Sequence, residues 1–231
     1  MVLIHEKDFE PNVDLHLHVR TTIRYEYSYI ENAALRIGDD VLEVVSFGQY
    51  ALNNVDQADL NDEEATLAGY PIYHTVKSSK EHIFEVVTGS NENITISTFK
   101  DMVSVKINGA RFEHFGQSVG IMGSVAGDML TRDGRVVNVT EDPSAFGQEW
   151  QVREDEPMLF RTARSPQAPK EQCKLPSAAS TDHLRRRLAK KSTRDAAEVA
   201  CAHVSSKSAK EACIFDVIAT SDLDIAHAGP Y

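Results

Sequence analysis

The chain has 231 residues, of which 42% are hydrophobic and 26% charged, a balance that suits one large folded domain or one domain with a small appendage. Its formal net charge of -11 argues against nucleic acid as the main partner, because such binding needs a basic surface. No apolar run reaches the roughly 18 residues of a spanning helix, so we expect no membrane span. The start lacks a basic segment followed by an apolar core, so we expect no secretion signal there.

The first predicted element is a run of strand character from Val13 to Ile30. Apolar and polar residues alternate in it, which puts Leu15 and Leu17 on one face and His16 and His18 on the other. A period of two is typical of a half-buried strand, so we predict a strand pair or one long bent strand here. The alternation alone places His16 and His18 on the solvent face.

Short apolar runs separated by turn residues follow. Gly38 and Asp39 lie between two such runs and predict a hairpin, and Asn108 with Gly109 predicts a later turn. The acidic stretch Asn53–Pro71 is expected to be an exposed insertion between strands. Many short strands at this spacing indicate an antiparallel sandwich or barrel. The other predicted strands are residues 48–53, 70–76, 82–89, 93–99, 102–109 and 110–116.

After Val152 the composition changes. Prolines recur between residues 153 and 180 and predict an extended linker, and helix formers dominate from residue 181. Two short helices are predicted there as an αα-hairpin, with Ser192 or Thr193 as the first N-cap. On the first helix Ala196, Val199, Ala200 and His203 lie at helical spacing. The predicted buried side of the second helix consists of Ala212, Phe215, Val217 and Ile218.

The sequence therefore predicts a mainly β protein. We expect an antiparallel β-sandwich domain over residues 1–152, a proline-rich linker over 153–180 and a small α-helical hairpin over 181–231.

The stretch from Phe115 to Gly134 contains glycines at positions 116, 120, 123, 127 and 134. A phosphate-binding loop would need a lysine directly after its last glycine, but Ser124 follows Gly123. A dinucleotide-binding fingerprint needs a particular glycine spacing between a strand and a helix, and neither condition is met. These glycines are therefore expected to serve tight turns and close approach of the backbone.

Residues 115–152 together resemble the C-terminal half of a von Willebrand factor type D domain. That family reads Cys-Gly-Leu-Cys-Gly-Asn, then an Asn/Asp-rich loop, Asp-Phe or Asp-Leu, a Thr-x-Asp-Gly turn and a Phe-Gly-x-x-Trp-x-Val ending. The matching residues here are Gly120, Ile121, Gly123, Asp128, Met129, Leu130, Thr131, Asp133, Gly134, Phe146, Gly147, Trp150 and Val152. The resemblance covers residues 13–152 more loosely. The resemblance implies a module that works in assembly and adhesion. The Gly-Asp-Pro-His sequence with which the family usually opens is missing from this chain.

Two departures from the family pattern bear on function. Val119 and Met122 stand where the family has cysteines, so we expect apolar core contacts in place of a local disulfide. Family members often hold Ca²⁺ in the following loop, and Ca²⁺ needs about six to eight oxygen ligands. Only Asp128, with Asp133 nearby, remains obviously competent, because a serine and an alanine occupy the other matching positions. We therefore expect no cofactor, with Ca²⁺ at this reduced loop as the alternative.

Few residues suggest metal binding or catalysis. His16 and His18 can present two imidazoles on one face of a strand, but the sequence places no third ligand beside them. A G-x-S-x-G nucleophile elbow is missing, and no acid–base partner is placed around Cys173, Cys201 or Cys213. We therefore expect no enzyme activity and no catalytic, cofactor-binding or metal-binding residue.

The cysteines lie too late in the chain to form a disulfide framework before Val152. The segment from Cys201 onward resembles the small cysteine-rich region that follows type D domains, with most of its cysteines absent. On that resemblance Cys201 and Cys213 form one disulfide between the two helices, which leaves Cys173 free or paired outside. Ordinary buried thiols are the alternative.

Asn93 and Asn138 each begin an Asn-x-Thr sequon, which matters only if the chain is secreted. Residues 183–191 are basic, and we expect them to be a solvated face before a helix.

Taken with the resemblance, these observations predict a non-enzymatic structural or adhesive module of a larger protein. We expect it to be extracellular or at the cell surface, and to bind protein partners or itself. The alternatives are a Ca²⁺-regulated binding module and a hydrolase with an unrecognised site in the acidic insertion. An intracellular location also stays open, because the loss of cysteines suits a reducing compartment.

Overall fold

A computed structural model describes residues 1–24, 27–60, 65–109, 114–124, 127–162, 186 and 190–228. The chain divides into two compact units. Residues 1–21 and 30–165 form the first unit, and residues 22–29 and 166–231 form the second. The predicted fold class, a mainly β antiparallel sandwich with a C-terminal helical hairpin, is confirmed.

The first sheet has six strands that follow one another in chain order. Its first two strands are joined at Asn12, whose φ of 65° closes the turn, and Gly38 begins the predicted hairpin turn, with a φ of 58°. The strands are β1 (Val2–Glu10), β2 (Val13–Arg24), β3 (Tyr27–Ile37), β4 (Asp40–Val45), β5 (Gln49–Leu52) and β6 (Val55–Asp56).

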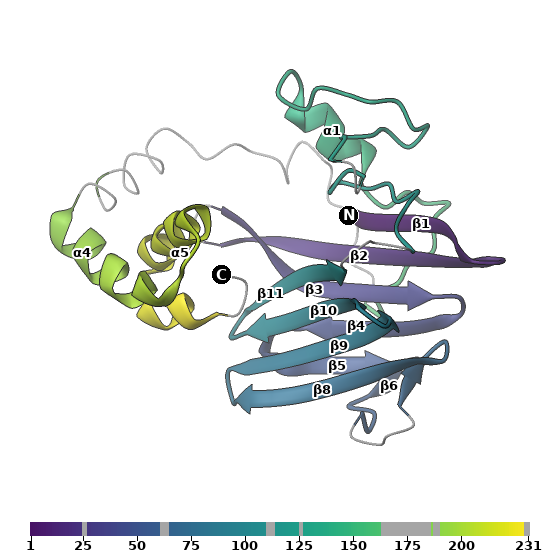
Figure 1. The fold of residues 1–231 in the computed structure, drawn as a ribbon, viewed down its shortest axis with the longest axis horizontal. Coiled ribbons are helices and arrows are strands. Elements are labelled where there is room, and N and C mark those ends of the chain that lie inside the picture. The colour runs from purple at the N-terminus through teal and green to yellow at the C-terminus, as the bar shows by residue number, and fades with distance from the viewer. Residues whose placement is uncertain are drawn as a thin grey trace. The chain divides into compact units, whose positions relative to one another are not determined.

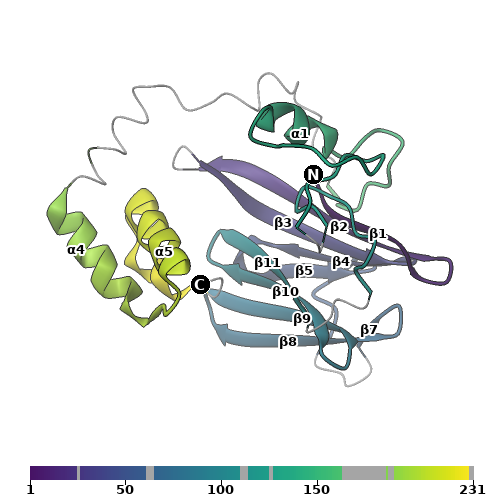
Figure 2. The ribbon, with the colours of Figure 1, turned by 45° about the horizontal axis from the view of Figure 1, so that its top comes forward.

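The second sheet has five strands, again antiparallel and in chain order. Figures 1 and 2 show it facing the first sheet. Asn108 and Gly109 do not form the predicted turn, because they pair with Asn93 and Glu92 as the end of the last strand. The strands are β7 (Thr66–Leu67), β8 (Tyr70–Ser78), β9 (Glu81–Gly89), β10 (Glu92–Phe99) and β11 (Met102–Gly109).

The main core lies between the two sheets. Leu15 and Leu17 face it from β2 and Phe84 faces it from β9, and none of the three has exposed surface. Removing such a side chain from water stabilises the folded state by about 1.5–3 kcal/mol. The period-two pattern of the sequence is therefore realised as an apolar layer between two sheets.

The predicted insertion Asn53–Pro71 is not wholly exposed. It contains β6 and β7, and Leu60 and Leu67 in it are buried in the main core. The stretch carries the chain from one sheet to the other, so its leucines are drawn into the space between them.

The β structure ends earlier than predicted. Between Gly109 and Val152 the described residues form two isolated bridges, His5 with Val119 and Leu130 with Val136, and the helix α1 (Pro143–Glu149). Residues 114–152 are thus a covering segment, and Figures 1 and 2 show α1 beside the N-terminal strand β1.

The predicted linker begins later than residue 153. Leu159 and Phe160 are buried against Ala34 of β3, and the backbone N–H and guanidinium of Arg161 contact the carboxylate of Glu43. Residues 153–162 therefore belong to the sandwich unit, because their apolar side chains complete the packing on β3. The linker residues 163–180, with Cys173, lie outside the described residues, as do Glu63 and Glu64.

The second unit contains the predicted helical hairpin. The helices are α4 (Lys191–Ala200) and α5 (Lys207–Thr220), and the short helices η2 (Cys201–His203) and η3 (Leu223–His227) follow them in turn. A disulfide joins Cys201 to Cys213, as the resemblance implied. No helix of the described chain is both long enough and apolar enough to cross a membrane.

The buried faces of these helices were only partly predicted. Val217 and Ile218 are buried as expected, whereas Val199 is 77% exposed and Ala197 is buried in its place. Ala197 lies one turn before Cys201, so the disulfide sets which face of α4 turns inward. The helix begins before the predicted caps, because the carbonyl of Lys190 already accepts from the following turn. Ala196, His203 and Ala212 are also exposed, and Ala200 and Phe215 are half-buried.

Candidate metal centre

Three side chains that can bind a metal converge on the outer face of the first sheet. His5 of β1 lies directly opposite His16 of β2, and Asp14 precedes His16 by two residues and so shares its face. Their ligand atoms all lie within 4.8 Å of one another. The Asp14 Oδ2 atom is 3.7 Å from the Nε2 atom of His5 and 3.9 Å from that of His16. The two rings stack with their centroids 4.1 Å apart.

The predicted solvent exposure of His16 and His18 is wrong. The His18 residue is only 1% exposed, and the side chain of His16 is 12% exposed. The alternation itself is right, but the covering segment 114–152 lies over this face. Trp150 packs on Val2, which pairs with His18.

Burial keeps these imidazoles neutral. Loss of water lowers the pKa of His16 to about 4 and that of His18 to about 3. It also lowers the pKa of His5, against the opposing attraction of the Asp14 carboxylate. At neutral pH the rings therefore carry lone pairs that are ready to bind a metal.

Some of these nitrogens have no hydrogen-bond partner among the described residues. They are Nε2 of His5 and both ring nitrogens of His18. At 3.7 Å, Asp14 is too far from His5 for a hydrogen bond. A buried imidazole nitrogen left without a partner is costly, so these atoms call for an explanation.

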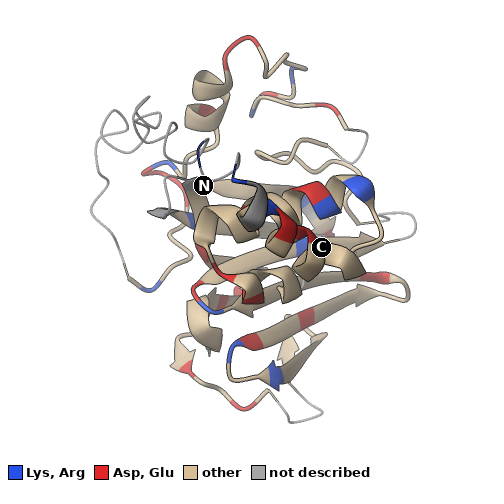
Figure 3. Cartoon of the chain, turned by 90° about the vertical axis from the view of Figure 1, so that its left-hand side faces the viewer, with Lys and Arg blue, Asp and Glu red and all other residues tan. Residues whose placement is uncertain are grey.

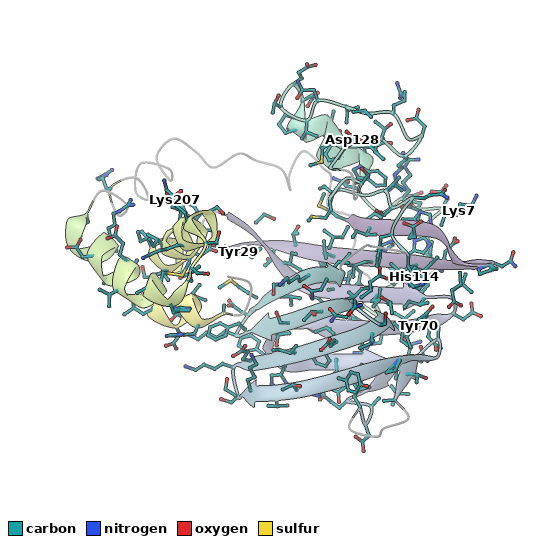
Figure 4. All side chains as sticks on the ribbon, in the orientation of Figure 1. Lys7, Tyr29, Tyr70, His114, Asp128 and Lys207 are labelled. Carbon is teal, nitrogen blue, oxygen red and sulfur yellow. A yellow bond between two sulfur atoms is a disulfide. The ribbon has the colours of Figure 1, made fainter. Side chains whose placement is uncertain are left out.

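The reduced calcium loop of the sequence is a separate place in the same unit. The backbone of Asp128 bonds to Ser124, and Asp128 is exposed beside α1, as Figure 4 labels it. Asp133 is exposed and binds the guanidinium of Arg135 and the hydroxyl of Thr131. Among the residues that the structure describes, the group that could hold a metal ion is His5, Asp14 and His16, and neither Asp128 nor Asp133 belongs to it.

The positions of the two missing cysteines differ from each other. Val119 is half-buried against Val2 and Trp150, as predicted. Met122 is 61% exposed and makes no core contact, so that expectation is wrong. Gly120 confirms the expected close approach, because its φ is 151° and an added Cβ would overlap the carbonyl of Leu3.

The two sequons lie in different settings. Asn93 is half-buried, and its amide nitrogen donates to Glu85. Asn138 is exposed, and its carbonyl oxygen accepts from the hydroxyl of Thr140 at 2.7 Å. Of the two, Asn138 is the more exposed, and its amide nitrogen donates to Glu141 at 3.0 Å.

A second polar cluster lies at one end of the sandwich. His114 Nδ1 is 2.8 Å from a carboxylate oxygen of the buried Glu92, which also accepts from Thr88 at 3.0 Å. Tyr70 donates to Glu10 nearby, and the ring of Phe9 contacts both Tyr70 and His114. Figure 4 labels Tyr70 and His114 at the same end of the sheet. These contacts engage only the Oε1 atom of Glu92, and its Oε2 atom is buried without a hydrogen-bond partner among the described residues.

A shallow hollow lies at the turn between β4 and β5. The side chain of Phe47 in this turn is 59% exposed. Its φ is 62°, a left-handed backbone conformation that bulky residues rarely adopt. Its N–H donates to the carbonyl of Lys100 at 2.6 Å, which fixes the turn. The hollow is lined by Val45, Phe47, Gly48, Gln49, Asp56, Gln57, His82 and Arg161.

No protein-family model matches the chain, and no curated protein matches it significantly. The resemblance to type D domains therefore stays a prediction.

Proposed function

We propose that the chain is a non-enzymatic interaction module of a larger extracellular protein, which binds protein partners or a second copy of itself. The observation that carries this proposal is Phe47, an exposed aromatic side chain held in a strained turn beside Arg161. Aromatic residues and arginine dominate the binding energy of protein interfaces. Strained residues persist where function requires them.

The turn would be more stable with a different residue. Phe47 and Gly48 both have positive φ within the three-residue turn Ser46–Gly48. Asparagine adopts this left-handed conformation at lower cost than a bulky residue such as phenylalanine. A phenylalanine here therefore costs stability while it presents a ring to the solvent, which is the pattern expected of a contact residue.

The extracellular location rests on the disulfide between Cys201 and Cys213. Such bonds persist in oxidising compartments and are rare in the cytosol. The type D resemblance of residues 115–152 points the same way.

Phe47→Asn tests the proposal. We expect the variant to gain about 1 kcal/mol of stability, because the strain of a left-handed bulky residue is relieved. We also expect it to lose association, measured by sedimentation and by clustering of protein-coated beads, and by adhesion of those beads to cell layers. Tyr73→Ala is the matched control, since Tyr73 is a comparably exposed aromatic on β8, at 56%.

Equal behaviour of wild type, Phe47→Asn and Tyr73→Ala in every association assay would contradict the proposal. If Tyr73→Ala alone lost association, the contact surface would instead be the outer face of the second sheet.

A further inference from the structure

The polar cluster on the outer face of β1 and β2 has the composition of a metal site rather than of an ordinary surface. Two imidazoles and one carboxylate come together from two strands, and nothing in the interaction proposal uses them. We propose that His5, Asp14 and His16 bind one divalent transition-metal ion of the Zn²⁺ class.

The distances fit such an ion. Two ligand atoms about 2.0–2.1 Å from a tetrahedral zinc ion lie about 3.4 Å from each other. The Asp14 Oδ2 atom is 3.7 Å from one imidazole nitrogen and 3.9 Å from the other. Both distances are within about 0.5 Å of that value, and all three ligand atoms lie within 4.8 Å of one another.

The state of the ligands fits as well. The Nε2 atom of His5 is buried and lacks a hydrogen-bond partner in the described part of the chain, so a metal would satisfy it. The same atom is one of the two nitrogens that face Asp14.

Two charged groups besides the ligands act on both imidazoles. Glu156 attracts a cation at this place, whereas Arg36 opposes it. The Asp14 carboxylate is itself a ligand and supplies the negative charge closest to the metal. Nitrogen ligands favour Zn²⁺, Co²⁺ or Ni²⁺ over Ca²⁺, which takes oxygen ligands almost alone.

The metal would act as a clamp on the N-terminal strand. β1 is the edge strand of its sheet and carries one ligand, while β2 carries the other two. His5 also pairs through its backbone with Val119 of the covering segment, at 2.7 and 2.9 Å. An ion at His5 would thus hold together β1, β2 and, through β1, the segment that covers them. The Asp14 side chain is 40% exposed, so water can reach the ion from that side as a fourth ligand.

The test uses the full chain, freed of metal by a chelator and then titrated with Zn²⁺ in a calorimeter. We expect one equivalent to bind and the melting temperature of the sandwich to rise. Co²⁺ should give the visible absorption of a four-coordinate site. Ca²⁺ at the same concentration should change neither quantity.

Two variants and one control identify the ligands. Asp14→Asn keeps the shape of the side chain, and His16→Ala removes an imidazole. Each variant should bind Zn²⁺ more than tenfold more weakly than the wild type. The circular dichroism of each should stay that of the folded chain. His203→Ala removes an exposed imidazole of the other unit and should leave the affinity unchanged. The proposal fails if the wild type binds no Zn²⁺, if Asp14→Asn binds as tightly as the wild type, or if His203→Ala abolishes binding. It also fails if Ca²⁺ rather than Zn²⁺ raises the melting temperature.

Discussion

The two units of the chain reach stability by different means. The sandwich unit contains no cysteine, and its core is built from apolar side chains of two sheets and from a covering segment on the outer face of the first. The helical unit is much smaller, and the disulfide between Cys201 and Cys213 closes its hairpin. A small domain buries too little surface to hold itself together, so a covalent link replaces part of the missing core.

The two units do not differ in how their charged residues are distributed. In Figure 3 acidic and basic residues are interspersed along the strands and helices. The difference is instead one of burial, because the sandwich unit encloses ionisable side chains such as Glu6 and His18. Each of the following changes acts on one unit and should leave the other intact.

The largest effect is expected for Trp150→Ala. The Trp150 side chain is 1% exposed, packs with Val2 and Phe146, and donates from its ring nitrogen to the carbonyl of Leu130 at 3.1 Å. Its loss should cost about 3–5 kcal/mol in the sandwich unit. Urea unfolding followed by circular dichroism measures this, with Val136→Ala, 66% exposed on the same segment, as the control. An equal loss in the control would contradict the role of the covering segment.

The disulfide should matter next. The double change Cys201→Ser and Cys213→Ser opens a loop with a sequence separation of 12, and a loop of this size is worth about 3 kcal/mol. We expect the helical signal to melt at a lower temperature while the sandwich transition stays where it is. A parallel fall of both transitions would mean that the units do not unfold independently.

The comparison also shows what the sequence could predict. Alternation of Leu15 with His16, and of Leu17 with His18, correctly placed the leucines in the core, because a period of two fixes which face is apolar. The hairpin at Gly38 was predicted for a similar local reason. The covering segment was not predicted, because its glycine turns resemble those of a β region and only tertiary packing separates the two. That packing turned the expected solvent face of His16 into a buried one.

The metal cluster could not be found from the sequence, because no pattern there showed that β1 is a strand paired with β2. The pairing contains a register shift between Val2 and Ile4, so His5 shares the outer face with Val2 although the two are three residues apart. Simple alternation places them on opposite faces. Asp14 and His16 could be seen as neighbours on one face of a strand, but their third partner depends on that bulge.

The smallest expected effect on stability concerns Glu6 of β1. Through Glu6, pH should change the stability of the sandwich unit but not that of the helical unit. Glu6 is 3% exposed, and burial raises its pKa to about 7 although its Oε1 atom accepts from the N–H of Gln117. A raised carboxyl pKa gives stability that is complete below the unfolded value of 4.5 and is lost as pH rises to about 7.

Glu6→Gln imitates the protonated carboxyl at every pH. Metal-free Glu6→Gln should therefore be about as stable as the wild type at pH 4 and more stable by about 1–3 kcal/mol at pH 8, since one pKa unit corresponds to about 1.4 kcal/mol. Urea unfolding at the two pH values measures the difference. The helical unit should show no such change, because Glu6 belongs to the sandwich. If Glu6→Gln and the wild type differ equally at both pH values, the pKa of Glu6 is the same in the folded and unfolded chain, which contradicts the prediction.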